Sequence, residues 1–185
     1  MKASRERAYA WARKHLAKIL ICVGAAIALS LLFGTSIFSI IAIAGLIMVA
    51  SFSTFYFNYV SAPVNFELVK LSTILVAYTH GIMPGLAVGI LSTVLGKVLI
   101  GRIDEKLPIS VAAISVVAVA ASLFGGVGIV ALGITLVAIY NVVMFSITML
   151  MGGDLAWNVP YEGTNFLINV VLFTRVAPLL LLLLK

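Results

Sequence analysis

Charged and amide side chains interrupt the apolar sequence at two places where their spacing could bind a polar ligand. Glu67 and Lys70 are three residues apart, so on a helix they share one face and can form an ion pair. Glu162, Asn165 and Asn169 fall within about 60° of one another on a helical wheel. Such groups inside a membrane helix usually face the protein interior or a water-filled cavity. Each set also has a structural interpretation, as an interfacial ion pair or as hydrogen bonds between helices.

Aromatic and basic residues near these groups extend the candidate set. Trp157 and Tyr161 could stack on a flat ligand, although such residues also form belts at membrane interfaces. Lys97 lies one turn before the end of its apolar segment, where it can bind a ligand or snorkel to the interface. The candidate substrate-binding residues are Asn58, Tyr59, Glu67, Lys70, Lys97, Trp157, Asn158, Tyr161, Glu162, Asn165 and Asn169.

Catalytic and metal-binding patterns are missing from the sequence. His15 and His80 are far apart, and neither has a cysteine or carboxylate at metal-ligand spacing. There is no phosphate-binding loop, no serine–histidine–aspartate arrangement, and no pair of carboxylates within an apolar segment. We therefore expect no enzyme activity, no metal and no cofactor.

Two very long uncharged stretches dominate the chain that must position these residues. All 48 residues between Lys18 and Glu67 lack a formal charge, as do all 47 between Lys106 and Asp154. One bilayer crossing needs roughly 20 apolar residues, so each stretch is long enough for about two crossings. Hydrophobic residues make up 63% of the chain, charged residues 10%, and the mean hydropathy is +1.24. The composition indicates a polytopic integral membrane protein with the lipid bilayer as its first partner.

Seven apolar segments predict the fold class, which is an all-α bundle of membrane helices. In lipid each segment must satisfy its own backbone hydrogen bonds, which favours helices, and the ten-residue alternation of a membrane barrel is absent. Residues 1–18 form a basic juxtamembrane segment, and residues 19–185 form the transmembrane bundle. The expected spans are 19–33, 37–57, 66–79, 82–100, 107–124, 127–151 and 165–184.

The basic segment at residues 1–18 predicts the orientation. It carries six lysines and arginines, opposed only by Glu6. Positive charge beside a span stays on the cytoplasmic side, which we favour over nucleic-acid binding. Because successive spans alternate sides, the loops at 58–63, 101–106 and 152–164 share one membrane face. That face collects most of the candidate residues, and with seven spans it is also cytoplasmic.

Two further patterns concern helix packing. Gly81, Gly85 and Gly89 are spaced by four residues, and small residues at this spacing allow membrane helices to approach closely. Arg175 lies near the middle of the last span, where a charge is costly. Tyr140 and Asn141 in the preceding span are its expected partners.

The segment from Phe66 to Gly101 resembles two helices of the substrate-binding S components of energy-coupling-factor transporters. The resemblance rests on a short amphiphilic helix, a glycine–proline turn and a ladder of small residues, at Gly81, Pro84, Gly85, Gly89, Ser92 and Gly96. The last helix, with Asn165 and Asn169, also looks like that family. The resemblance implies a six-helix core, here with an extra N-terminal helix. It also implies that the polar face lies outside the cell, whereas seven spans with a cytoplasmic N-terminus place that face inside. The resemblance further implies that a small-residue patch docks a transmembrane coupling subunit, either at Gly24, Ala25 and Ala28 or in the region from Ala42 to Ala50.

Two functions follow as expectations. The first is a membrane-embedded subunit that binds a small, vitamin-like solute for an uptake transporter, together with a coupling subunit and an ATPase pair, in the cell membrane. The second is a non-transporting scaffold or accessory subunit of a membrane complex, because MreD-like membrane proteins have a related six-helix fold. Neither function involves nucleic acid.

Overall fold

The computed structural model describes residues 36–60, 62–101 and 103–184, and all regular secondary structure in these ranges is helical. The chain divides into two units between Ile41 and Ala42, and the helical bundle belongs to the second of these units. The predicted span at 19–33 and the small-residue patch at Gly24, Ala25 and Ala28 lie outside the described residues.

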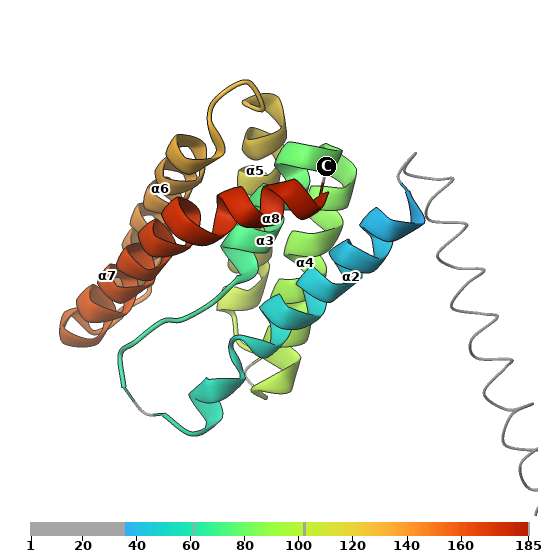
Figure 1. The fold of residues 1–185 in the computed structure, drawn as a ribbon. Coiled ribbons are helices and arrows are strands. Elements are labelled where there is room, and N and C mark those ends of the chain that lie inside the picture. Colours follow the sequence, from blue (N-terminus) through green and yellow to red (C-terminus); the bar gives the residue numbers. More distant parts are fainter. Residues whose placement is uncertain (1–35, 61, 102, 185) are drawn as a thin grey trace, which may run out of the picture. The chain divides into compact units, whose positions relative to one another are not determined.

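The bundle consists of long apolar helices around one short helix (Figure 1). Five helical stretches in the described part of the chain are long and apolar enough to cross a membrane. The protein is therefore a multi-pass helical membrane protein, as its composition predicts. The helices are α2 (Ile37–Phe52), the 3-10 turn η1 (Phe55–Asn58), α3 (Val69–His80), α4 (Ile82–Leu99), α5 (Lys106–Leu123), α6 (Ile129–Leu150), α7 (Leu155–Val171), the π-helical turn η2 (Leu172–Val176) and α8 (Ala177–Leu184).

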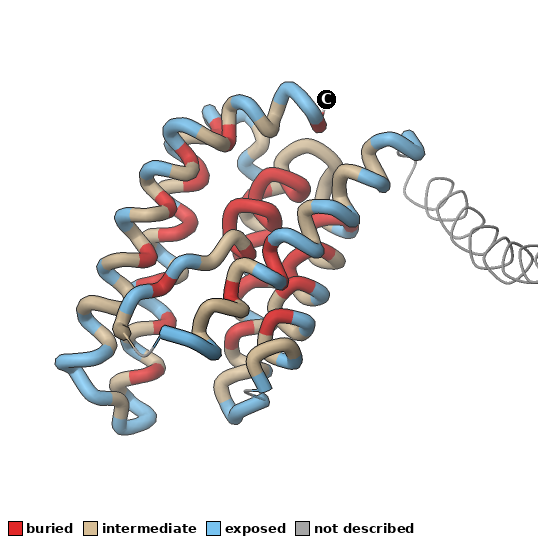
Figure 2. Tube along the Cα trace, turned by 60° about the horizontal axis from the view of Figure 1, so that its bottom comes forward, coloured by how far each residue is buried: buried red, intermediate tan, exposed pale blue. Residues whose placement is uncertain are grey.

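Helix α3 is the centre of the bundle. Every residue from Val69 to Ala77 is buried, and Figure 2 shows these buried turns surrounded by the other helices. Helix α3 contacts α4, α5, α6 and α8. At 12 residues it is only about 18 Å long, which is shorter than a bilayer core. The burial of its first nine residues means that protein, rather than lipid, surrounds most of the helix.

The glycine ladder of α4 packs against α3, as its spacing predicts. Gly85 and Gly89 are buried, and a Cβ atom on Gly85 would lie 2.4 Å from the Cβ of Ala77. Gly81 joins the two helices with φ at +88°, a backbone conformation that glycine adopts without steric cost. The two helices therefore form a close antiparallel pair at this end.

The segment at 152–164, expected to be a loop, is helical from Leu155 onward. Gly152, with φ at +81°, turns the chain after α6, and the Asp154 side chain accepts a hydrogen bond from the Ala156 backbone N–H at 2.9 Å. This N-cap satisfies one of the free donors at the helix start. Pro160 lies within α7. The capping aspartate therefore outweighs the turn-like composition of the segment.

The prediction that Tyr140 and Asn141 are partners of Arg175 is wrong. Arg175 is exposed, within the π-helical turn η2, while Tyr140 lies beneath Lys70 and Asn141 donates to the Glu162 carbonyl. Phe173 takes the inward position of this turn and packs against Gly133, where a Cβ atom would lie 2.1 Å from its ring. The extra residue of the π turn thus places the aromatic ring inside and the guanidinium outside.

Candidate functional site

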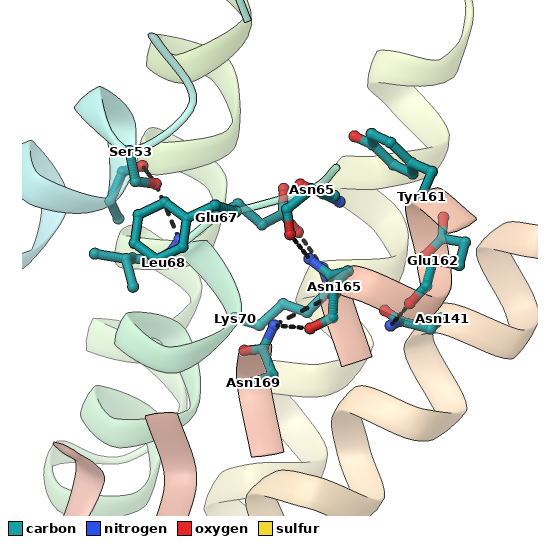
Figure 3. Close-up of polar contacts among 12 residues, drawn as sticks. Ser53, Asn65, Glu67, Leu68, Lys70, Asn141, Tyr161, Glu162, Asn165 and Asn169 are labelled. Carbon is teal, nitrogen blue, oxygen red and sulfur yellow. Dashed lines mark hydrogen bonds and ion pairs between the residues drawn. The ribbon is translucent and has the colours of Figure 1, made fainter. Parts of the chain in front are cut away.

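A cavity of about 380 Å³ lies at the end of the bundle where the predicted polar loops meet. Its wall comes from the start of α3 and the segment before it, and from α4, α5, α6 and α7. Residues more than 100 positions apart in the sequence therefore line the same cavity. Figure 3 shows the polar contacts around its inner part. The charged and aromatic lining residues are Phe57, Glu67, Lys70, Lys97, Asp104, Lys106, Tyr140, Trp157, Tyr161 and Glu162.

One wall of the cavity is irregular backbone between η1 and α3. The Tyr56 hydroxyl donates to the Val64 carbonyl at 2.6 Å and accepts from the Phe66 N–H at 2.7 Å. The Ser53 hydroxyl accepts from the Leu68 N–H at 2.9 Å. Non-helical backbone at membrane depth is tolerated only where protein or a water-filled cavity surrounds it. These side chains therefore satisfy polar backbone groups of the irregular segment beside the cavity.

Lys70 lies at the inner end of the cavity and is 1% exposed. Its ammonium group pairs with Glu67, donates to Asn165 Oδ1 at 3.0 Å and lies 4.5 Å from the centre of the Tyr140 ring. A buried charge needs such compensation because its desolvation is costly. The Glu67–Lys70 pair is therefore an interior ion pair, with its cation supported from three sides.

Asn165 and Asn169 are fully buried behind the cavity and do not line it. Asn165 Nδ2 donates to the Asn65 carbonyl at 3.4 Å, and Asn169 Nδ2 donates to the Asn165 carbonyl at 2.9 Å. Together with the Lys70 contact, these bonds join α7 to the start of α3 (Figure 3). The geometry supports the structural interpretation of this pair, in which the amides hold Lys70 in place.

Glu162 lines the cavity on the side of α7. Its backbone carbonyl accepts from Asn141 Nδ2 at 3.3 Å, whereas its carboxylate makes no hydrogen bond or ion pair with any described residue. The neighbouring Tyr161 stacks on Phe57, with ring centres 6.0 Å apart. The carboxylate therefore faces the cavity beside an aromatic surface and keeps its hydrogen-bonding capacity free.

The outer rim of the cavity is basic and aromatic. Lys97 pairs with Asp104, with its ammonium 3.3 Å from both carboxylate oxygens. Lys106 is the first residue of α5 and also lines the cavity. Trp157 is 46% exposed, and Asn158 Nδ2 donates to the Asp154 carbonyl at 2.7 Å. At the rim, Lys97 is therefore already paired, whereas Lys106 has no ion-pair partner in the part of the chain that the structure describes.

The structure brings together most of the candidate residues. Those that line the cavity are Glu67, Lys70, Lys97, Trp157, Asn158, Tyr161 and Glu162. Tyr59 is 78% exposed, and Asn58 donates to the Leu99 carbonyl at 3.4 Å. Neither of them lines the cavity, so the adjacent loop contributes Phe57 and Val60 instead.

Several lining residues were not among the candidates. Lys106 and Asp104 belong to the most charged loop, whose position on the polar face was a usable signal. Tyr140 was predicted to be a partner of Arg175 rather than a cavity residue. Asn65 and Ser92 had no signal in the sequence. The Asn65 Oδ1 and Ser92 Oγ atoms are buried without a hydrogen-bond partner in the described part of the chain, which is uncommon in folded proteins and leaves them available to a bound molecule.

Comparisons with known proteins give no family or function for the chain. No family model, no curated protein and no solved structure matches the chain. The arrangement itself can bind a molecule through charges, hydrogen bonds and aromatic surfaces. The features of this chain that bear on its function are therefore the cavity and its lining.

Proposed function

We propose that this chain is a membrane-embedded binding protein for a small polar solute, acting as the binding subunit of an uptake transporter in the cell membrane. The observation that supports this is the cavity of about 380 Å³, open at one end of the bundle. Small-molecule sites typically measure about 300–1,000 Å³ and combine apolar walls with a few placed polar groups.

The lining sets the size and character of the solute. Tyr140, Tyr161 and Trp157 supply aromatic surface, while Glu162 and Ser92 supply hydrogen-bonding groups that have no partner among the described residues. A vitamin-sized molecule with a flat or apolar part and separate polar groups matches both features. The buried Lys70 cluster forms the base against which such a molecule would lie.

Transport would require partners. The sequence contains no phosphate-binding loop, so the proposed energy source is an ATPase pair acting through a transmembrane coupling subunit. This part of the proposal rests on the resemblance to S components. Of the two candidate docking patches, the one at Gly24, Ala25 and Ala28 belongs to the segment that the structure does not describe.

The test begins with mass spectrometry of small molecules extracted from the protein purified in lipid nanodiscs. A solute present in stoichiometric amount would then be measured for binding to Trp157→Ala and to Tyr59→Ala. Both variants lose one exposed aromatic ring at the same end of the bundle, but only Trp157 lines the cavity. We expect weaker binding in Trp157→Ala alone.

Two outcomes would contradict the proposal. One is a solute whose affinity is equally insensitive to both changes, which would move the site elsewhere. The other is a protein that carries no small molecule and shows no saturable binding, but purifies with other membrane proteins. That result would support the alternative function, a scaffold or accessory subunit.

A further inference from the structure

The charges around the cavity do not cancel locally. Six charged side chains line it, and four of them form the ion pairs Glu67–Lys70 and Lys97–Asp104. Glu162 and Lys106 remain, and neither has an ion-pair partner within the ranges the structure describes. One carboxylate and one ammonium group, both facing the same cavity, are therefore left over.

The unpaired carboxylate belongs to the inner, aromatic part of the cavity. Glu162 is seven residues after the start of α7 at Leu155, which corresponds to about 10 Å along the helix axis. Tyr140 and Tyr161 line the cavity with it. Glu67 and Lys70 form an ion pair, so Glu162 is the carboxyl group at this end without an ion-pair partner among the described residues. Aromatic faces beside a carboxylate favour an organic cation such as an ammonium group.

The unpaired ammonium group belongs to the rim. Lys106 is the first residue of α5, and a cation at a helix N-terminus is at the unfavourable end of the helix dipole. Asp104, the nearest acidic residue in sequence among those lining the cavity, is already shared with Lys97. Lys106 thus contributes little to its own helix, and the rim carries one net positive charge. An anionic group is the partner that this position lacks.

We propose that the solute is a zwitterion, with its cationic amine at Glu162 and its anionic group at Lys106. This inference rests on the proposed binding function and names the chemical class of the solute. A molecule with both charges satisfies both unpaired side chains, whereas a molecule with a single charge leaves one of them without a partner. Asn65 Oδ1 and Ser92 Oγ, also in the cavity lining, offer hydrogen bonds to the part of the solute between its charged ends.

The test is a thermal-shift and binding screen of the nanodisc-embedded full chain against matched compounds. Indole, phenyl, imidazole and short aliphatic scaffolds would each be supplied as the amino acid, the amine alone, the acid alone and the neutral alcohol. We expect saturable binding mainly among the amino acids. For a compound that binds, Glu162→Gln and Lys106→Gln should each weaken binding by about tenfold or more.

Control variants separate the loss of a cavity charge from the loss of charge in general. Glu105→Gln removes an exposed carboxylate next to Lys106 that does not line the cavity, and Arg175→Gln removes an exposed cation on η2. Both should bind as the wild type does. A further expectation is selective: Glu162→Gln should reduce the advantage of the amino acid over the acid alone, and Lys106→Gln its advantage over the amine alone.

The two proposals fail in different ways. Compounds that bind as well in the neutral or singly charged form, with no loss in Glu162→Gln and Lys106→Gln, would overturn the zwitterion inference and leave the binding function standing. No saturable binding by any compound, together with no co-purifying small molecule, would overturn the binding function and the zwitterion inference with it.

Discussion

The two ends of the α3–α4 pair differ in how closely the chain packs. At the closed end, near Gly85, the helices approach so tightly that no Cβ atom fits against Ala77. At the other end α3 gives way to irregular backbone, and the 380 Å³ cavity opens between Lys70 and Gly96. Packing of small residues holds one end, and ion pairs with amide hydrogen bonds hold the other. The comparison indicates that the rigid contact at the closed end positions the polar groups at the open end.

The largest effect is expected at the closed end, from Gly85→Leu. A Cβ atom at Gly85 would lie 2.4 Å from the Ala77 Cβ and 2.7 Å from its Cα, so the backbone itself must move. The loss of stability should exceed the ~1–3 kcal/mol typical of overpacking. Thermal denaturation in detergent measures it. The control is Gly45→Leu, because nothing lies within 4 Å of a Cβ there. Equal melting temperatures for the two variants would show that the ladder does not carry the packing.

The next largest effect is expected at the open end, from Lys70→Met. This change leaves the Glu67 carboxylate without its buried partner, and removing one member of a buried ion pair typically costs about 3–5 kcal/mol. The double variant Glu67→Gln/Lys70→Met removes both charges and should recover much of that loss. Chemical or thermal denaturation of the wild type, Glu67→Gln, Lys70→Met and the double variant gives the coupling between the two residues. A coupling near zero would mean that the pair does not stabilise this end.

A smaller effect is expected from Asn165→Ala, which removes a hydrogen-bond acceptor of Lys70. The amide accepts from Lys70 at 3.0 Å and donates to the Asn65 carbonyl at 3.4 Å. Leaving these buried groups unsatisfied should cost about 1–3 kcal/mol. Because Asn165 does not line the cavity, solute selectivity should stay the same while affinity and melting temperature fall together. A change of selectivity at unchanged stability would show direct contact with the solute.

The smallest effect is expected from Asn58→Ala. Asn58 is exposed, lies outside the cavity lining and makes one long hydrogen bond, at 3.4 Å, to the Leu99 carbonyl. Exposed substitutions of this kind usually change stability by about 0.5 kcal/mol or less. Melting temperature and solute affinity should both match the wild type. A clear loss of affinity would extend the binding site to this loop.

The sequence was sufficient for the features that depend on long apolar runs and on small-residue spacing. Uncharged length predicts the membrane helices, and the ladder through Gly85 and Gly89 predicts the close α3–α4 contact. It was not sufficient where several helices meet. Tyr140 lies beneath Lys70, whereas Arg175 is exposed within the π-helical turn, and no sequence periodicity reveals such a turn. The helical start of α7 depends on one cap at Asp154, within a segment that otherwise has the composition of a loop.

The shortness of α3 has a consequence for how the protein is made. At 12 residues, or about 18 Å, α3 cannot span a bilayer core of about 30 Å. It also carries Lys70 near its start, a residue that resists partition into lipid on its own. Helix α3 therefore has to leave the insertion machinery together with α4, as one hairpin closed by the Gly81 turn. During biosynthesis, α3 and α4 would then enter the membrane as a pair, rather than one helix at a time.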